Sequence, residues 1–254
     1  MSELMAIAAA ALRSDQTRMD QISLNAANVS TTGYRRGIVV SSSFAHSMET
    51  AEATTSSSAN HSGEEPASAS LLPALSSAVD QTQAALTVTN RPLDVAIDGN
   101  AYLVLSDGEK TYLTRSGAFK VDANGYLLGP RSLRVQGTQG DIHVSSQEGL
   151  SIASDGRMTS NGQQIATLKM LSPGKGAILT STDGVVLSSN SDEYVDAAPG
   201  TATVRSGSLE ASNASGVEDM LQLVETVRHF EGMVRLIQGY DDILGRAIQK
   251  LGDI

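Results

Sequence analysis

Both ends of the chain carry a seam of apolar residues with heptad spacing, and this feature constrains the fold more than any other. Steps of three and four residues connect the members of the N-terminal seam, which are Met5, Ala8, Leu12, Asp15, Met19, Ile22, Ala26 and Val29. Such spacing places these side chains on one face of an α-helix. The sequence therefore predicts an N-terminal amphipathic helix of roughly 25 residues, with Asp15 as the one polar position of its seam.

The C-terminal seam is longer and more regular. Its members are Met220, Leu223, Val227, Phe230, Val234, Ile237, Asp241, Leu244, Ile248 and Leu251, again with a single aspartate. A helix over residues 217–251 would be roughly 50 Å long, because each residue of an α-helix adds about 1.5 Å.

Two long amphipathic helices need partners, because an isolated helix cannot bury its apolar face. The most economical arrangement pairs the two seams, which predicts a discontinuous coiled-coil domain built from residues 1–36 and 208–254. The residues we assign to packing between helices and subunits are Met5, Leu12, Met19, Ile22, Leu223, Val227, Phe230, Val234, Ile237, Leu244, Ile248 and Leu251. The alternative is that each seam packs against the middle of the chain as ordinary core.

Residues 37–90 have the composition of an extended linker. Within residues 41–70, ten Ser, three Thr and six Ala make up 19 of the thirty residues, and no Lys or Arg occurs. A segment of this composition has too little apolar surface to fold alone. We expect a connection between domains, and the alternative is an interface with neighbouring subunits of an assembly.

Between residues 91 and 207 the periodicity changes from helical to strand-like, as the alternation of Leu93, Val95 and Ile97 illustrates. Asx-Gly pairs interrupt the strands and supply the positive φ angles of tight hairpins. These pairs end at Gly99, Gly108, Gly125, Gly156, Gly162 and Gly184. Because no long helical pattern separates the strands, we predict an all-β antiparallel domain and an α+β fold class overall.

Composition narrows the classes of partner. The formal net charge is -10, from 18 Lys plus Arg against 28 Asp plus Glu, which argues against binding to nucleic acid or to an anionic membrane. The sequence has no run of about 18 apolar residues, which is the length needed to span a bilayer. The N-terminus also lacks the basic start of a secretory signal. The chain contains no Cys, which excludes disulfides and thiolate metal sites.

The sequence contains no recognisable catalytic arrangement. His46, His61, His143 and His229 occupy four different settings, and no pair has the spacing of a zinc site. The turn at residues 172–176 lacks the spaced first glycine of a phosphate-binding loop, and Asp122 begins only the first part of a calcium-loop pattern. We therefore expect no enzymatic activity, no metal and no cofactor.

Residues 25–36, Asn-Ala-Ala-Asn-Val-Ser-Thr-Thr-Gly-Tyr-Arg-Arg, resemble the signature that closes the N-terminal helix of flagellar rod and hook proteins. The matching residues are Asn25, Asn28, Thr31, Gly33 and Tyr34, whereas Thr32 stands where that family usually has Pro. Side-chain hydrogen bonds from Asn28, Ser30 and Thr31 would end the helix, and Gly33 would allow the turn that follows.

Two further blocks are similar to the same family. Residues 91–127 match the order and spacing of the opening strands of the family's β domain, through Leu93, Asp94, Asp98, Gly99, Arg115, Gly117 and Phe119. Residues 207–231 resemble its C-terminal signature, with Asn213-Ala214-Ser215 where members commonly have Asn-Val-Asn. Three blocks in the same order are more specific than any one of them.

The resemblance implies a structural subunit of the bacterial flagellum, located in the periplasm-spanning rod of the basal body. It implies an inner coiled-coil domain and an outer β domain over residues 91–207. The implied partners are other axial subunits, further copies of this chain, and the flagellar type III export apparatus, which leaves no cleaved signal peptide. Subunits that stack head to tail build an open helical assembly, and such a rod would transmit motor torque.

Within the family, the overall length and residues 241–247 are most similar to proximal rod proteins. A distal rod or hook-type position is the first alternative. A secreted β-domain adhesin or binding module with oligomerising helical ends is a more remote one, since few aromatic residues are available on the strands.

Overall fold

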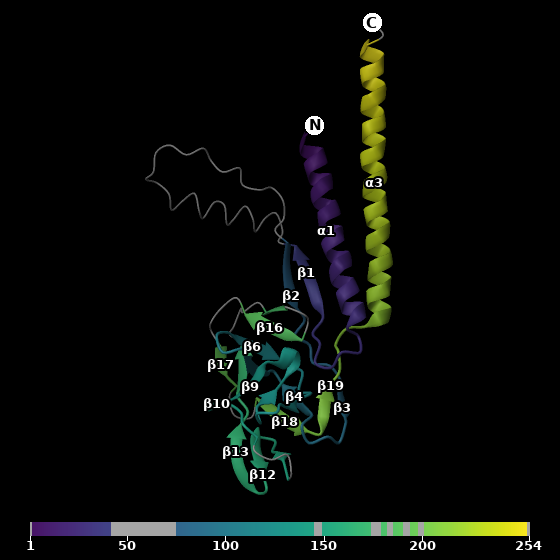
Figure 1. The fold of residues 1–254 in the computed structure, drawn as a ribbon. Helices are drawn as coiled ribbons and strands as arrows, with labels where there is room; N and C mark the ends of the chain where they lie inside the picture. Colours follow the sequence, from purple (N-terminus) through teal and green to yellow (C-terminus); the bar gives the residue numbers. More distant parts are fainter. Residues whose placement is uncertain are drawn as a thin grey trace, which may run out of the picture. The chain divides into compact units, whose positions relative to one another are not determined.

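The computed structural model describes residues 2–41, 75–144, 149–173, 179–181, 185–189, 194–197 and 201–252. The chain forms two compact units, whose elements are drawn in Figure 1. Unit 1 comprises residues 1–23, 38–77 and 217–254, and unit 2 comprises residues 24–37 and 78–216. Each unit is therefore assembled from segments that lie far apart in the sequence.

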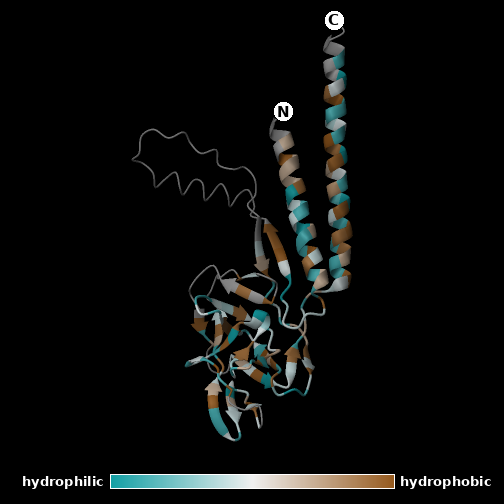
Figure 2. Cartoon of the chain, viewed as in Figure 1, coloured by the Kyte–Doolittle hydropathy of each residue, from teal (hydrophilic) through white to brown (hydrophobic). Residues whose placement is uncertain are grey.

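Two long helices supply most of the described part of unit 1. Helix α1 extends over Ser2–Ala27 and helix α3 over Gly216–Gly252, which confirms the two helices that the seams predicted. Figure 2 shows hydrophobic residues recurring along both helices between hydrophilic ones, as expected for amphipathic helices. Strands β1 (Gly37–Ser41) and β2 (Leu75–Val79) form a separate two-stranded sheet.

The predicted linker over residues 37–90 contains more structure than its composition suggested. Besides β1 and β2, it includes β3 (Leu86–Val88), which pairs with β19 (Ser208–Glu210) in antiparallel register. Backbone hydrogen bonds to a distant strand hold β3, and composition carries no signal for such pairing. Residues 42–74, and with them most of the Ser-rich stretch, lie outside the described residues.

Unit 2 is built from antiparallel strands. The remaining strands are β4 (Val95–Gly99), β5 (Tyr102–Ser106), β6 (Thr111–Thr114), β7 (Lys120–Val121), β8 (Leu127–Leu128), β9 (Arg134–Gly137), β10 (Gly140–Asp141), β11 (Ser151–Ile152), β12 (Arg157–Ser160), β13 (Gln163–Thr167), β14 (Met170–Pro173), β15 (Leu179–Ser181), β16 (Val186–Ser189), β17 (Tyr194–Asp196) and β18 (Ala202–Ser206). A short 3-10 helix, Pro130–Ser132, precedes β9.

The largest sheet of unit 2 has ten strands, with β15, β16, β6, β5, β9, β8 and β7 in that order along its main path. Strands β11, β12 and β13 form a second sheet, while β18 pairs with β4. The described pairings in this unit are antiparallel, which confirms the predicted sheet type.

Alternate side chains of β5 pack into two different apolar clusters. Leu103 and Leu105 belong to the larger cluster, whereas Tyr102 and Val104 belong to the smaller one. Side chains of a strand alternate between the two faces of a sheet, so β5 has apolar neighbours on both faces. This double burial explains why β5 reads as a continuous apolar run in the sequence.

The predicted turn glycines adopt the conformation that the sequence suggested. Five of the six have φ between +79° and +115°, and these are Gly99, Gly108, Gly125, Gly156 and Gly162. The sixth, Gly184, lies outside the described residues. Asp122 accepts hydrogen bonds at Oδ1 from the backbone N–H groups of Asn124 (2.9 Å) and Tyr126 (2.7 Å), which is a turn and not a partial calcium loop.

Candidate functional site

The first family-like block folds around the buried side chain of Asn25. Its Oδ1 atom accepts hydrogen bonds from the Tyr34 hydroxyl (2.9 Å) and from the Gly37 backbone N–H (3.0 Å). Its amide group donates to the Gly37 carbonyl oxygen at 3.0 Å. One side chain thereby holds the segment after α1 against the last turns of that helix, because all its polar atoms are used.

Asn28 and Thr31 act at the end of α1 as predicted. The Asn28 amide donates to the Leu24 carbonyl oxygen at 2.9 Å, and the Thr31 hydroxyl donates to Asn28 Oδ1 at 3.0 Å. The first bond satisfies a carbonyl group near the end of the helix, and the second holds the Asn28 side chain in place.

Gly33 is required by its surroundings and not only by its turn. Its φ is +71°, and a Cβ atom at this position would overlap the backbone of Ser116. Its N–H donates to the Glu210 carbonyl oxygen at 2.8 Å. The segment after α1 thus touches both the β block and the C-terminal block, and any side chain at this position would separate them.

A buried ionic triad joins the three family-like blocks. Arg35, Arg115 and Glu210 come from the first, second and third block respectively, and each side chain is 1% exposed. Arg35 Nη2 lies 2.8 Å from Glu210 Oε1, and Arg115 Nη1 lies 3.4 Å from Glu210 Oε2. We call Asn25, Gly33, Arg35, Arg115 and Glu210 together the motif junction.

Backbone groups add further hydrogen bonds to the triad. Arg115 donates to the carbonyl oxygens of Ile97 (3.2 Å) and Gly99 (2.6 Å), and Arg35 donates to the Thr82 carbonyl oxygen. Glu210 Oε1 accepts a further bond from the Ala84 N–H at 3.0 Å. Buried charges are tolerated when they are paired and hydrogen-bonded in this way.

The aromatic ring of Tyr102 forms one wall of the motif junction. The Arg115 guanidinium carbon lies 4.7 Å from the centre of this ring, within the range of a cation–π interaction. Burial, together with the neighbouring positive charge of Arg35, lowers the pKa of Arg115, and burial raises the pKa of Tyr102. Tyr102 therefore stays neutral beside the charged triad.

Asn213 ties the start of the C-terminal segment to the same region. Its Oδ1 accepts a hydrogen bond from the Arg36 N–H at 2.6 Å, and its amide donates to the carbonyl oxygens of Asp80 (3.1 Å) and Thr82 (3.0 Å). Hydrogen bonds from Thr82 and the charges of Arg35 and Arg36 outweigh the effect of burial and lower the pKa of Asp80.

The other residues predicted from the second block are structural in unit 2. Asp94 is buried and forms an ion pair with Arg91 at 3.0 Å, and Asp98 pairs with Arg205 at 2.7 Å. Leu93 is partly buried against the main core and Phe119 is buried within it. The predicted residues Gly99 and Gly117 have no room for a Cβ atom, since it would meet the backbone of Thr201 or of Val95.

Most of the predicted seam residues whose burial is described are buried or partly buried. The exceptions are Met5 (38% exposed), Ala26, Val29 (38%), Met220 (67%) and Asp241. On α1, Ile22 is buried, and Leu12 and Met19 are partly buried. On α3, the partly buried seam residues are Leu223, Val227, Phe230, Val234, Ile237 and Leu244. The side chains of Ile248 and Leu251 lie outside the described residues.

A contact between Asp15 and His229 joins the two helices in unit 1. His229 Nδ1 of α3 lies 2.6 Å from Oδ2 of Asp15, the predicted polar position of the α1 seam. No functional role for His229, Arg35 or Glu210 was predicted from the sequence. No local pattern marks these residues, because their partners lie in distant segments.

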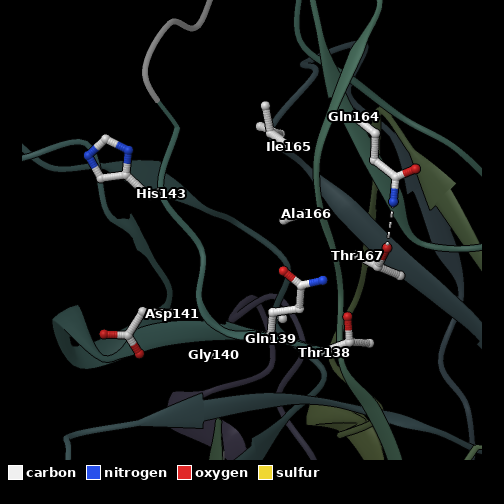
Figure 3. A pocket seen from close by; sticks show the side chains of 10 residues that line it. Thr138, Gln139, Gly140, Asp141, His143, Gln164, Ile165, Ala166 and Thr167 are labelled. Atoms are coloured by element: carbon white, nitrogen blue, oxygen red, sulfur yellow. Dashed lines mark hydrogen bonds between the residues drawn. The ribbon is translucent and has the colours of Figure 1, made fainter.

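An open polar pocket of about 380 Å³ lies in unit 2, between the β9–β10 turn and β13 (Figure 3). Its lining consists of Gly137, Thr138, Gln139, Gly140, Asp141, His143, Gln164, Ile165, Ala166 and Thr167. Asp141 is already paired with Arg134 (2.7 Å), and His143 Nε2 lies 2.9 Å from the Asn124 carbonyl oxygen. The lining therefore offers no acid–base pair poised for catalysis.

The part of the chain that the structure describes contains no cluster of three or more residues arranged to hold a metal ion. None of its helices combines the length and apolar character needed to cross a bilayer. His46 and His61 lie outside the described residues, as does most of the turn at residues 172–176.

The fold and the motif junction define a class of structural protein. The segment after α1 and the segment before α3 meet in a buried ionic network. The two helices themselves carry exposed apolar residues. Residues 205–250 match the family described as flagellar basal body rod FlgEFG protein C-terminal, and residues 96–160 match the family described as flagellar hook protein FlgE/F/G D1 domain.

Individual relatives agree with these matches. The chain is 30% identical over 195 residues to the flagellar basal-body rod protein FlgF of Escherichia coli strain K12, which covers 71% of this chain and 77% of that protein. It is 28% identical over 249 residues to the flagellar basal-body rod protein FlgG of Bacillus subtilis strain 168, covering 92% of this chain and 93% of that protein. The match to the flagellar hook protein FlgE of Treponema pallidum strain Nichols is 39% identical but covers only 27% of that protein.

The chain therefore belongs to the flagellar basal-body rod and hook protein family and is of the FlgF/FlgG type. It is a structural subunit of the flagellar axis. The three family-like blocks recognised in the sequence are also the segments that converge in the motif junction.

Replacing Glu210 by Gln tests the importance of the triad. The variant leaves two buried guanidinium groups with no carboxylate, so we expect the free energy of unfolding of the full chain to fall by about 3–5 kcal/mol. Urea denaturation followed by circular dichroism measures this change. Glu109→Gln is the matched control, because Glu109 is exposed, and it should change stability by less than about 0.5 kcal/mol. Equal stability of the two variants would contradict the assignment.

Replacing Gly33 by Ala tests the close approach to Ser116. Ala at a positive φ costs about 1–2 kcal/mol, and the overlap with the Ser116 backbone adds to this cost. Gly162→Ala is a matched control, since φ is +79° there and an added Cβ would meet nothing within 4 Å. We expect Gly33→Ala to destabilise the chain by at least about 2 kcal/mol more than the control does. A difference near zero in urea denaturation would show that the approach at Gly33 is not required.

Proposed function

We propose that this chain is a subunit of the proximal rod of the flagellar basal body and transmits motor torque through a helical assembly. In this proposal α1 and α3 pair along their seams, and the pair packs against the corresponding helices of neighbouring subunits. The role is mechanical and not catalytic. The similarity to FlgF of Escherichia coli supports the proximal position.

The observation that carries the proposal is the exposed apolar surface of α3. Val217, Leu221 and Ile243 are 75%, 68% and 66% exposed. Leu236 and Ile243 are spaced by one heptad, and at about 100° per residue they point away from the seam that contains Phe230 and Ile237. A helix with apolar residues on opposite sides needs partners on both sides, which a single copy of α1 cannot supply.

The partners we propose are further copies of this chain and other axial subunits of the flagellum. Contacts between copies that stack head to tail are heterologous, so they extend into a helix and do not close into a ring. Many modest contacts between parallel helices add up to a large resistance to twisting. We propose export by the flagellar type III apparatus without cleavage of a signal peptide, and a final location in the rod that spans the periplasm.

A distal position in the rod is the second candidate. The similarity to FlgG of Bacillus subtilis favours it, because that match covers 92% of this chain. Cross-linking of isolated basal bodies followed by mass spectrometry would distinguish the two positions by identifying the neighbouring subunits.

Replacing Val227 and Ile237 together by Asp tests the role of the seam. The double variant places two unpaired carboxylates among partly buried apolar side chains, so we expect incorporation into the basal body and swimming motility to be lost. Motility in soft agar and the subunit content of isolated basal bodies measure the effect in a strain whose own copy is deleted.

The matched control is Gln238→Asp combined with Gln249→Asp, which adds the same two charges at exposed positions of α3. We expect the control strain to swim normally, because its two added charges lie outside the seam. Normal motility of the Val227→Asp and Ile237→Asp strain would overturn the proposed function.

A further inference from the structure

The buried residues of α1 within unit 1 repeat every seven residues. Among the residues of this helix segment whose burial is described, only Ala8, Asp15 and Ile22 are buried. The carboxylate of Asp15 therefore occupies the middle position of an otherwise apolar stripe, where an unpaired charge would be costly. Its side chain is 5% exposed, and it contacts His229 at 2.6 Å.

The position of this contact along each helix agrees with an antiparallel pair. Asp15 lies twelve residues before the end of α1 at Ala27, and His229 lies thirteen residues after the start of α3 at Gly216. At about 1.5 Å per residue these stretches span about 18 Å and about 20 Å. The end of α1 and the start of α3 lie close together. Val29 follows α1 by two residues, and its side chain lies 3.7 Å from the position that a Cβ atom on Gly216 would occupy.

We propose that the Asp15–His229 pair is a polar lock that sets the register of α1 against α3. This inference rests on the helix pairing that the proposed function includes. In the register that the contact defines, Ala8 lies near Ile237 and Ile22 lies near Leu223, because each pair is one heptad from Asp15 and Phe230.

A slip of one heptad would remove the imidazole that contacts the carboxylate. Residues seven positions from His229 on α3 are Gln222 and Leu236, so a slip would offer the carboxylate an amide or an apolar side chain in place of the imidazole. The apolar residues of the seam do not oppose such a slip, because they recur at the same heptad positions and would meet other apolar residues. Asp15 is thus the position that distinguishes the observed register from its neighbours, as single polar residues do in coiled coils.

His229 can fill this role because it reaches the carboxylate from beside the seam. Its side chain is 60% exposed, so the imidazole contacts solvent on one side and buried Asp15 on the other. The pair differs from the Arg35–Glu210 pair, which is buried on both sides. A half-exposed pair contributes little to overall stability, so its effect is expected on the choice of register.

Disulfide trapping measures the register directly, because the natural chain contains no Cys. One double-cysteine variant, Ala8→Cys with Ile237→Cys, reports the observed register. A second, Ala8→Cys with Leu244→Cys, reports a slip of one heptad, because residues about 10 Å further along a helix are beyond the reach of a disulfide. The intramolecular disulfide in the purified full chain is quantified by mass spectrometry after mild oxidation.

With Asp15 and His229 intact, we expect the first pair to form a disulfide and the second to form little. In an Asp15→Leu background, the ratio of the two products should fall by roughly tenfold, because the seam becomes wholly apolar and tolerates slipped registers. The exchange Asp15→His with His229→Asp should restore the ratio. Asp20→Leu, at an exposed position of α1, should leave it unchanged.

The outcomes separate the lock from the pairing. An unchanged ratio in the Asp15→Leu background, with the first pair still forming, would overturn the lock and leave the helix pairing intact. Failure of the first pair to form in the chain with Asp15 and His229 intact would overturn the pairing itself, and the lock with it. Failure of the exchanged pair to restore the ratio would show that Asp15 acts through something other than its contact with His229.

Discussion

The carboxylate of Glu210 lies between the guanidinium groups of Arg35 and Arg115, and the arrangement of unit 2 depends on this contact. Each residue comes from a different part of the sequence, and none of the three charges could be buried without the others. The triad therefore links the correct placement of the segment after α1, the β block and the segment before α3. Asn25, Gly33 and Asn213 add backbone contacts that fix the same three segments.

The junction lies in the segments through which the chain passes between the β-rich unit and the two helices. Residues 24–37 and 211–216 connect the β-rich unit to α1 and α3, and they are anchored by hydrogen bonds within unit 2. In the proposed rod, any force passed between the helices and the β-rich unit travels along these two connections. A buried, hydrogen-bonded network suits a mechanical subunit, because breaking one of its ionic contacts leaves an unpaired buried charge.

Local sequence patterns predicted the helices and turns, because residues close together in the sequence determine them. The heptad seams gave both helices to within a few residues, and Asx-Gly pairs marked turns such as those at Gly125 and Gly156. Contacts between distant segments could not be predicted in this way. The pairing of β3 with β19 and the contacts of Glu210 depend on the complete fold, and no local pattern signals them. The resemblance to a family identified the relevant blocks, and the structure showed that they meet.

The central claim is that this chain is built into the rod of the basal body as a structural subunit. Electron cryomicroscopy of basal bodies isolated from the source bacterium tests the claim most directly. We expect copies of this chain in the rod, each contributing α1 and α3 to a layer of packed helices and the β-rich unit to a separate layer. A rod density in which every subunit is accounted for by other proteins, with this chain absent, would contradict it.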